Sequence, residues 1–336
     1  MAHTYKESGI DYEAMDKLKN AALNYSGNRQ NLIEFPNFYL VDILEGLGSL
    51  NKLADTIYQK TQQDYYFQVG WGNAASVLND LAVTGATPLT IKLFIAAGHA
   101  NWFKNQDCWQ NLIAGFGEAA KFASCSWNGG ETQTLPGLIQ EDSFILAGSA
   151  TGIIKPKRQI LEEKKIRPGD RIILCESSGI HTNGITFIRK NFPDDLEVYT
   201  EAVKNKTLIY LPFINKLLAD KVDIHYVSHI TGHGWRKLMR PKRPFTYVLE
   251  DIPKPQLIFQ KIREKSAMDD RQMYADFNMG AGLAIYAPSS SVDRILKIAQ
   301  SQSVAAFDAG FVEKGPRKVI IKPIHVEFDG ADLNIR

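Results

Sequence analysis

Hydrophobic residues along the chain alternate between the spacing of β-strands and the spacing of α-helices. Residues 38–44 read Phe-Tyr-Leu-Val-Asp-Ile-Leu, which predicts a buried strand. Residues 73–84 place their hydrophobic side chains on one helical face, and Gly85 with Pro88 just beyond predicts the end of that helix. Further strands are predicted at 89–96, 144–154, 171–175, 245–249, 282–287 and 318–322, and further helices at 108–123, 183–190, 208–219 and 291–300.

The alternation breaks at residues 155–170, a charged stretch with two prolines, which predicts a domain junction. Residues 1–35 are polar, with a short helical pattern near 12–23, and are interpreted as an N-terminal extension. We therefore predict one domain over residues 36–155 and a second over 168–336. Strand and helix patterns alternate in both halves, so the expected fold class is α/β, or α+β layers.

Composition narrows the class of protein. Hydrophobic residues make up 44% of the chain and charged residues 23%, a globular balance. A net charge of +2 argues against nucleic-acid binding, and the basic run at 236–243 is more typical of a solvated face. Three cysteines without metal-type spacing favour a reducing compartment. With no apolar leader and no membrane-spanning run, we expect a soluble cytoplasmic protein without a membrane partner.

The segment 175–184 reads Cys-Glu-Ser-Ser-Gly-Ile-His-Thr-Asn-Gly and lies between a predicted strand and a predicted helix. Free backbone N–H groups, hydroxyls and the helix dipole at such a junction favour an anion site. His181 could donate a hydrogen bond to a phosphate or exchange a proton near neutral pH. The alternative is a capped helix, with Thr182 or Asn183 as N-cap and His181 on the surface.

Carboxylates beside glycines form a second group of candidates. They occur in Glu45-Gly-Leu-Gly-Ser49, Asn79-Asp80 and Gly129-Gly-Glu-Thr132, and a related cluster is Ile230-Thr-Gly-His-Gly234. Glu45, Asp80 and Glu131 together would give the hard oxygen ligands that Mg²⁺–ATP requires. Singly, Asp80 is more often a surface residue of a helix, and a Gly-Gly-Glu sequence is more often a turn. The chain contains no P-loop sequence, so a nucleotide site would need another design.

The spelling and order of several motifs closely resemble the aminoimidazole ribonucleotide synthetase family, also called phosphoribosylformylglycinamidine cyclo-ligase. The motifs, which span nearly the whole chain, are Tyr5-Lys-Glu-Ser-Gly-Ile-Asp11, Val77-Leu-Asn-Asp-Leu81 with Gly85-Ala-Thr-Pro88, Gly129-Gly-Glu-Thr132 with Pro136-Gly137, Ser177-Ser-Gly-Ile-His-Thr-Asn-Gly184, His229-Ile-Thr-Gly232 and Phe277-Asn-Met-Gly-Ala-Gly282.

The resemblance implies a two-domain fold whose N-terminal, ATP-binding domains pair through their sheets into a barrel in a homodimer. It also implies purine biosynthesis: ATP phosphorylates an amide oxygen of a small phosphorylated substrate, and a neighbouring nitrogen then closes the imidazole ring. The implied nucleotide-binding positions are Gly46, Gly48, Asn79, Asp80, Gly129, Gly130, Glu131 and Thr132, with Asp80, Glu45 and Glu131 holding Mg²⁺. The implied substrate or phosphate positions are Ser177, Ser178, Gly179, Thr182, Thr231 and Gly232, and the implied catalytic residues are His181 and Asn183.

Departures from the family pattern gather on the nucleotide side. The family stretch Thr-Asp-Gly-Val-Gly-Thr-Lys aligns with 44–50, so that Glu45 replaces its aspartate and Leu50 its phosphate-facing lysine. A second family aspartate falls at Gly72, and a glycine of the second-domain turn is His233. An ATP-dependent ligase is the favoured interpretation. The alternatives are a non-catalytic or regulatory relative, or an ATP-dependent enzyme of the same superfamily with another substrate.

Overall fold

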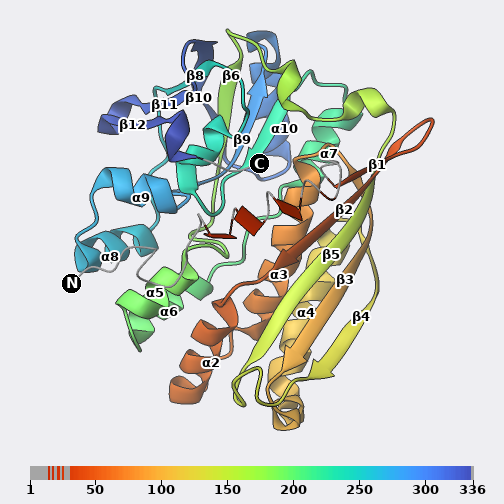
Figure 1. The fold of residues 1–336 in the computed structure, drawn as a ribbon, viewed down its shortest axis with the longest axis vertical. Coiled ribbons are helices and arrows are strands. Elements are labelled where there is room, and N and C mark those ends of the chain that lie inside the picture. The colour runs from red at the N-terminus through yellow and green to blue at the C-terminus, as the bar shows by residue number, and fades with distance from the viewer. Residues whose placement is uncertain (1–13, 16, 19–20, 23–24, 26–30, 334–336) are drawn as a thin grey trace.

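The structure is a computed structural model that describes residues 14–333, apart from 16, 19–20, 23–24 and 26–30. Two mixed β-sheets, each with helices packed on it, form two domains (Figure 1). The strands of the N-terminal sheet come from residues 32–154, and those of the C-terminal sheet from residues 171–329. The predicted mixed α/β architecture is confirmed. The predicted helical pattern near 12–23 and the motif at 5–11 lie largely or wholly outside the described residues.

The N-terminal sheet has the strand order β1-β2-β5-β3-β4. The strands are β1 (Leu32–Glu34), β2 (Tyr39–Gly46), β3 (Thr87–Ala97), β4 (Ser126–Thr134) and β5 (Phe144–Ile154). β5 is antiparallel to both β2 and β3, whereas β4 runs parallel to β3 at the edge. Every second residue of β5 is buried, as the two-residue period of a strand requires when only one face is covered.

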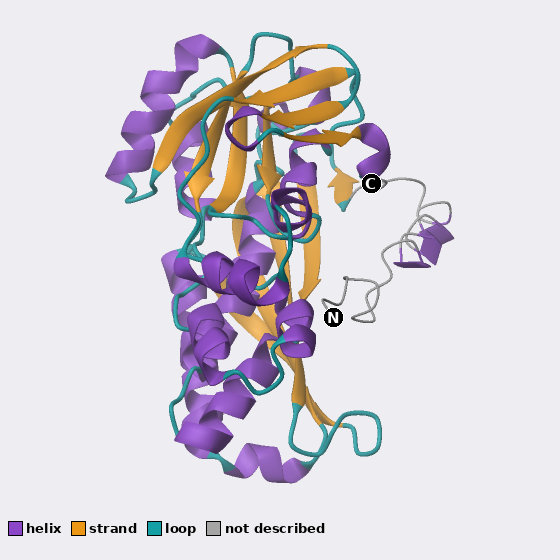
Figure 2. Ribbon diagram, turned by 90° about the vertical axis from the view of Figure 1, so that its left-hand side faces the viewer, coloured by secondary structure: helices purple, strands orange, loops and turns teal. Residues whose placement is uncertain are grey.

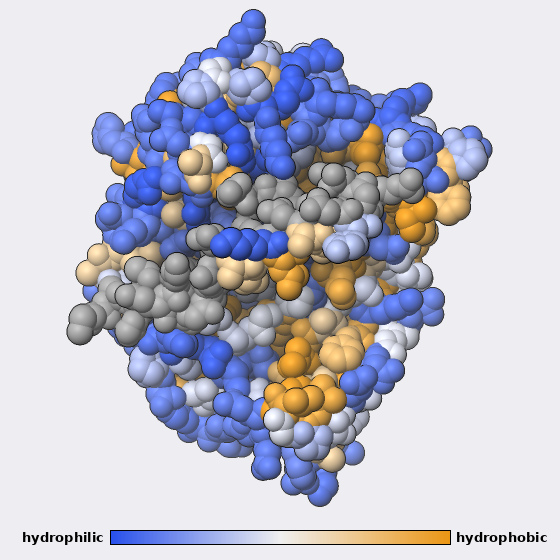
Figure 3. All heavy atoms as spheres, viewed as in Figure 1, coloured by the Kyte–Doolittle hydropathy of each residue, from blue (hydrophilic) through white to orange (hydrophobic). Residues whose placement is uncertain are grey.

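Helices cover one face of this sheet and leave the other open. The helices are α2 (Leu50–Thr61), α3 (Tyr66–Ala82) and α4 (Gln106–Phe122). Seen edge-on, they lie on one side of the sheet (Figure 2). On the open face Leu44 is 73% exposed and Ile145 47% exposed, and hydrophobic side chains gather there (Figure 3). Such an uncovered apolar surface is unusual for a monomer.

The C-terminal sheet has the order β12-β11-β8-β10-β6-β9-β7 and is antiparallel except between β8 and β11. Its strands are β6 (Arg171–Glu176), β7 (Tyr226–His229), β8 (Phe245–Leu249), β9 (Ala281–Ala287), β10 (Ala306–Lys314), β11 (Lys318–Ile321) and β12 (Val326–Asp329). Its helices are α5 (Ile185–Asn191), α6 (Leu196–Val203), α7 (Leu211–Ala219), α8 (Leu257–Ser266), α9 (Asp270–Asp276) and α10 (Val292–Ser301).

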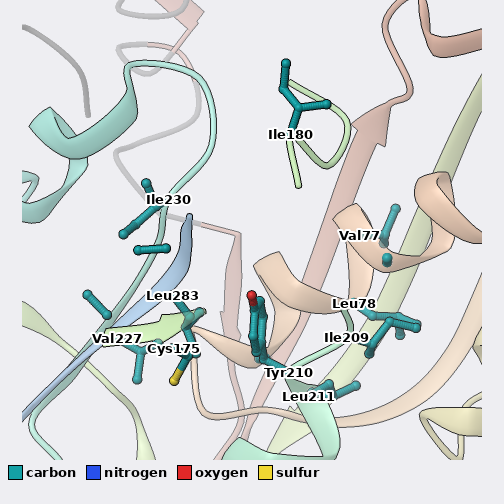
Figure 4. Close-up of a cluster of buried hydrophobic side chains, with 14 of the residues drawn as sticks. Val77, Leu78, Cys175, Ile180, Ile209, Tyr210, Leu211, Val227, Ile230 and Leu283 are labelled. Atoms are coloured by element: carbon teal, nitrogen blue, oxygen red, sulfur yellow. The ribbon is translucent and has the colours of Figure 1, made fainter. Parts of the chain in front are cut away.

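Helix α3 joins the two domains. It packs on β2 and β5 with one face and contacts α7 of the C-terminal domain with another. Figure 4 shows Val77 and Leu78 of α3 beside Ile209 in a buried hydrophobic cluster that continues to Tyr210 of the C-terminal domain. Asn79 adds two hydrogen bonds, from its Nδ2 to the carbonyl of Leu208 (2.8 Å) and from the Tyr210 N–H to its Oδ1 (2.8 Å). The domains therefore share one continuous core.

Most predicted elements are present, with displaced ends. The predicted helix at 73–84 is α3, which begins at Tyr66 and ends at Ala82. Its early glycines do not break it: a Cβ on Gly70 would lie 1.9 Å from the carbonyl oxygen of Leu112, so this glycine permits close packing on α4. The expected turn at Gly129-Gly130 is wrong, because both residues belong to β4. Within the described residues, no helix is both long and apolar enough to cross a membrane.

Candidate functional site

The loop from Ser177 to Gly184 lies where the two domains meet. It leaves β6 and enters α5, and its backbone adopts left-handed or related conformations at Gly179 (φ 146°), His181 (φ 58°) and Gly184 (φ 81°). A positive φ is uncommon outside glycine, and at His181 it is held by the surrounding contacts. The loop therefore has a defined, compact path rather than that of a simple helix cap.

Side chains of the loop hold it to the rest of the protein. The Ser177 hydroxyl donates to the carbonyl of Gly179 (3.0 Å), and the Ser178 hydroxyl donates to the carbonyl of Lys206 (2.6 Å). The Thr182 hydroxyl lies 2.8 Å from that of Ser76 on α3. These three hydroxyls, predicted to bind substrate or phosphate, thus have partners within the chain. Their placement leaves backbone groups as the more available donors.

Asn183 connects the loop to the turn that follows β7. Its Oδ1 accepts a hydrogen bond from the backbone N–H of Gly232 (3.1 Å), and Thr231 lies in the same turn. The expected N-cap is wrong for both candidates, because Gly184 is the N-cap residue of α5 and makes no side-chain bond there. Asn183 instead orders two predicted substrate-binding segments against each other.

Within the described residues, the backbone N–H groups of residues 179–184 donate no hydrogen bond to another residue. Gly179 has open space where a Cβ would stand. Backbone N–H groups without acceptors are the usual donors of an anion site in a loop. The loop thus offers donors through its main chain while its hydroxyls fix its shape.

His181 is the buried centre of the loop rather than a surface residue, with 7% of its surface exposed. Its Nε2 accepts a hydrogen bond from the N–H of Ser178 (3.2 Å), so the neutral ring carries its proton on Nδ1. That Nδ1 is buried and has no partner among the described residues. Burial, with a smaller contribution from His229, lowers the pKa of His181 to about 3. The ring is therefore a neutral hydrogen-bond donor at physiological pH, which corrects the expectation of a charged or titrating histidine.

Asp80 projects from α3 toward the C-terminal domain. One of its carboxylate oxygens lies 2.6 Å from Nδ1 of His229, at the end of β7, and the side chain of Glu45 lies within hydrogen-bonding reach. Burial opposes ionisation, but the hydrogen bond and charge of His229 and the charge of Lys237 lower the pKa of Asp80 to about 2. Asp80 is therefore a carboxylate between the domains.

Glu131 lies away from this carboxylate pair. Glu45 on β2 lies opposite Gly148 on β5, so the two residues face the same side of the sheet. A Cβ added to Gly148 would meet Asn73 of α3, so this side is the one that the helices cover. Glu131 pairs with Phe94 on the open face, where both line a cavity of about 410 Å³. The structure does not bring the predicted metal ligands Glu45, Asp80 and Glu131 together. No group of three or more His, Cys, Asp or Glu suited to a metal occurs in the described part of the chain.

The remaining predicted nucleotide-binding positions fall into separate places. Gly46 is the last residue of β2 and Gly48 lies just beyond it, near Glu45, and both have open space where a Cβ would stand. Gly129, Gly130 and Thr132 lie on the edge strand β4. Asn79 is fully buried, and both its amide oxygen and its amide nitrogen bond to the C-terminal domain. The structure thus gives Asn79 a role in the domain interface.

The sequence analysis did not identify two residues that contribute to the site. His229 pairs with Asp80, and Lys237 acts electrostatically on the same carboxylate. His229 stands at the start of the quoted His-Ile-Thr-Gly motif, so a signal for it was present. Lys237 belongs to a basic run that was interpreted as a solvated face, and only the fold brings it near α3.

Comparison with known proteins gives matches over both domains. The family described as AIR synthase related protein matches with its N-terminal domain at residues 49–154 and with its C-terminal domain at residues 167–322. Proteins named phosphoribosylformylglycinamidine cyclo-ligase are similar: that of Clostridium perfringens strain 13 is 31% identical (95% of this chain, 99% of the relative), and that of Methanocaldococcus jannaschii is 30% identical (90% of each).

Solved structures show the same fold at low sequence identity. A structure titled HypE–HypF complex matches with a TM-score of 0.64 and 15% identity, over 90% of this chain and 95% of that one. A structure of the hydrogenase maturation protein HypE in complex with ATP matches with a TM-score of 0.60 and 16% identity, over 91% and 90% of the chains.

Proposed function

Because the chain belongs to the AIR synthase related protein family, we propose that it is an ATP-dependent phosphoribosylformylglycinamidine cyclo-ligase of purine biosynthesis. In this reaction ATP transfers its terminal phosphoryl group to the amide oxygen of the acyclic ribonucleotide. A neighbouring nitrogen of the substrate then attacks the activated carbon, the imidazole ring closes, and ADP and phosphate leave. The cyclo-ligases at about 30% identity along nearly their whole length support this proposal.

The observation that carries the proposal is the loop 177–184, with its unpaired backbone donors and the buried Nδ1 of His181. A buried N–H without an acceptor costs free energy, so the native loop gains when a ligand oxygen accepts from it. A neutral donor also suits charge that develops on the phosphorylated oxygen, since it needs no proton from solvent. We assign His181 to that oxygen or to the phosphoryl group, and Asn183 to holding the loop in place.

Glu45 and Asp80 are the residues that would hold Mg²⁺. Mg²⁺ is commonly bound by one or two carboxylates together with phosphate oxygens and water, so this adjacent pair fits the ion without Glu131. When bound, the ion neutralises negative charge on the polyphosphate. The low pKa of Asp80 keeps its carboxylate ready to act as a ligand at neutral pH. We therefore propose a site at the junction of β2, α3 and the C-terminal domain.

The test is ADP release by the purified protein with Mg²⁺–ATP, with and without formylglycinamidine ribonucleotide. We expect ADP only when the substrate is present, together with a product that absorbs as an imidazole. Substrate-independent ADP release, or none under either condition, contradicts the proposed reaction. An active cyclo-ligase of the same family serves as the positive control for substrate quality.

A non-catalytic relative is the second candidate, and one observation favours it. Leu50, at the lysine position of the family pattern, is buried with 2% exposure, and the family's second aspartate position is Gly72. Compared with the family pattern, the positions expected to contact the nucleotide therefore lack one cation and one carboxylate. Failure to bind ATP at millimolar concentration, in a protein that still binds the substrate ribonucleotide, would favour this candidate over the enzyme.

We further propose that the protein is a homodimer formed through the open face of its N-terminal sheet. Exposed Leu44 and Ile145 support this pairing, since an apolar sheet face is stabilised when a second copy covers it. Sedimentation should give a dimer for the wild type and a monomer for Leu44→Asp. Leu257→Asp, at an exposed leucine of α8, is the matched control and should remain dimeric. A wild-type monomer at micromolar concentration overturns this arrangement.

We also infer a cytoplasmic location. Cys108, Cys125 and Cys175 are all free thiols, which is typical of a reducing compartment. When the protein is isolated from its native source and then denatured, thiol labelling should find all three cysteines reduced. A disulfide in protein isolated under thiol-blocking conditions would contradict this location.

A further inference from the structure

We propose that Asn278 is a positioning residue of the candidate site: its side-chain amide turns the peptide between Gly179 and Ile180 so that the Ile180 N–H can donate to a phosphate oxygen. This inference deepens the proposed function, on which it rests for the identity of the ligand. Asn278 belongs to the motif Phe277-Asn-Met-Gly-Ala-Gly282, which the proposed reaction leaves without a role.

Three consecutive carbonyl groups of the loop 177–184 each accept a hydrogen bond from a side-chain amide. The pairs are Gln256 Nε2 with the carbonyl of Ser177 (2.6 Å), Asn205 Nδ2 with that of Ser178 (3.1 Å) and Asn278 Nδ2 with that of Gly179 (2.9 Å). The three amides belong to segments that are distant from the loop and from one another in sequence. The fold therefore brings three separate donors to one short stretch of backbone.

A carbonyl held in this way also fixes the direction of the N–H group that follows it. The peptide bonds of residues 177–180 are trans, and in a trans peptide the C=O and N–H bonds point in opposite directions. The first of these peptides shows the effect. Its carbonyl, on Ser177, is bonded to Gln256, while its N–H, on Ser178, donates the other way to Nε2 of His181 (3.2 Å).

The next two peptides leave their N–H groups without an acceptor. The N–H of Gly179 is directed away from Asn205, and that of Ile180 is directed away from Asn278. Neither group donates a hydrogen bond within the part of the chain that the structure describes. Backbone N–H groups of neighbouring residues are typical donors to a phosphate in a loop. The side-chain amides thus prepare two such donors.

Asn278 is more firmly held than the exposed amide of Asn205. It is 3% exposed, and the Gly280 N–H donates to its Oδ1 (3.0 Å). That bond identifies the oxygen of the amide, so the nitrogen is the atom that faces the Gly179 carbonyl. The Ser177 hydroxyl lies 3.0 Å from the same carbonyl oxygen and 3.1 Å from Oδ1 of Asn278. A buried amide and a buried hydroxyl therefore fix this peptide together.

The motif that contains Asn278 also supports the rest of the loop. A Cβ on Gly282 would lie 2.9 Å from Cε1 of His181, so this glycine leaves room for the ring. The ring of Phe277 packs against Gly184, where an added Cβ would lie 2.5 Å from its Cε1. A loop that shifted after loss of the Asn278 amide would also move the buried Nδ1 of His181.

Steady-state kinetics of Asn278→Ala with Mg²⁺–ATP and formylglycinamidine ribonucleotide test the inference. We expect kcat/KM to fall by about tenfold or more, the usual effect of losing a hydrogen bond to a charged group. A raised KM for the ribonucleotide would assign the loop to the phosphate that the substrate carries throughout the reaction. A lowered kcat would assign it to the transferred phosphoryl group. Unchanged kcat and KM overturn the inference.

Thr246→Val is the matched control for loss of a buried hydrogen bond. Thr246 is 4% exposed, and its hydroxyl donates to the carbonyl of Pro316 (3.0 Å) at the end of the sheet opposite the loop. This variant should lose stability but keep the wild-type kcat/KM, and an equal loss of kcat/KM would contradict a positioning role for Asn278. If Asn278→Ala does not fold, Ser177→Ala replaces it, because it removes the other side chain bonded to the Gly179 carbonyl.

Binding of inorganic phosphate separates failure of this inference from failure of the proposed function. Phosphate at constant ionic strength should raise the melting temperature of the wild type more than that of Asn278→Ala. A wild type that phosphate stabilises in this way, but that releases no ADP, overturns the proposed reaction and leaves the role of Asn278 standing. A wild type that releases ADP, with an equal kcat/KM in Asn278→Ala, overturns this inference alone. A wild type with neither property overturns both.

Discussion

Asp80 of the N-terminal domain and His229 of the C-terminal domain are joined by a 2.6 Å contact between a carboxylate oxygen and Nδ1. The pair places a proposed magnesium ligand at the seam between the domains, where the side chain of Asp80 is 33% exposed. Nucleotide binding and the relative position of the two domains are therefore linked through one side chain.

Replacing Asp80 with Asn should abolish Mg²⁺-dependent nucleotide binding, because an amide oxygen lacks the charge that Mg²⁺ prefers. Calorimetry should show an affinity for ATP that no longer differs between buffers with Mg²⁺ and with EDTA. Asp142→Asn, at an exposed carboxylate of the same domain, should keep the difference. An unchanged Mg²⁺ dependence in Asp80→Asn would remove this residue from the metal site.

His181 should act without titrating in the physiological range. Its pKa is lowered to about 3, so the ring stays neutral from pH 5 to pH 8. If the reaction occurs as proposed, His181→Ala should lower kcat by about 100-fold or more, the usual cost of removing one donor to developing charge. Any inflection in the kcat–pH profile of the wild type should therefore also be present in the profile of His181→Ala. Loss of an inflection near pH 6.5 would assign proton transfer to His181 instead.

A buried carboxyl of helix α2 should make stability fall as pH rises. Asp55 is 3% exposed and accepts a hydrogen bond from the Tyr66 hydroxyl (2.6 Å), and burial raises its pKa from 3.8 to about 7. Between pH 3.8 and about pH 7 the folded state therefore keeps a proton on Asp55 that the unfolded chain has released. The stability that the protonated Asp55 gives to the folded state is lost as pH rises through about 7.

Asp55→Asn should remove that dependence and stabilise the protein at pH 8 by about 2–4 kcal/mol, while the gain shrinks toward pH 4. Urea unfolding of the wild type and the variant at pH 4 and pH 8 measures these differences in the free energy of unfolding. Asp42→Asn, at an exposed aspartate of β2, is the control and should change the free energy of unfolding little. Equal stabilities of wild type and Asp55→Asn at pH 8 would show that Asp55 has no raised pKa.

Asn79 should be a structural residue of the domain interface. Asn79→Ala removes both bonds to residues 208 and 210 and leaves buried backbone groups unpaired, which should cost about 2–4 kcal/mol of unfolding free energy. Asn205→Ala, which loses one exposed bond to the Ser178 carbonyl, should cost under about 1 kcal/mol. A lost ATP affinity with unchanged stability in Asn79→Ala would instead support the nucleotide-binding role expected from the sequence.

Regular elements were predictable where hydrophobic spacing was clean. The strand β8 (Phe245–Leu249) agrees with its prediction at both ends. Helix α2 was not predicted, although Leu50, Leu53 and Ile57 have helical spacing. β10 was missed because a bulge between Asp308 and Gly310 interrupts its alternation. Spacing reports local periodicity and cannot reveal such irregularities.

The candidate site was predictable at the level of its motifs but not of its contacts. The loop around His181 was found, yet the engagement of Thr182 with Ser76 joins residues 106 positions apart in sequence. The separation of Glu131 from Asp80 depends on which face of the sheet each residue occupies. That property follows from strand register, which the sequence of one strand does not determine.

Helix α3 has a consequence for how the protein unfolds. Because it contributes to the packing of the N-terminal sheet and to the hydrophobic cluster with the C-terminal domain, neither core is complete without it. Loss of the helix exposes apolar surface on both sides at once, so neither domain has an independent melting event. Calorimetry of the intact chain should then give one cooperative transition, and ligands that bind one domain should raise the melting temperature of both.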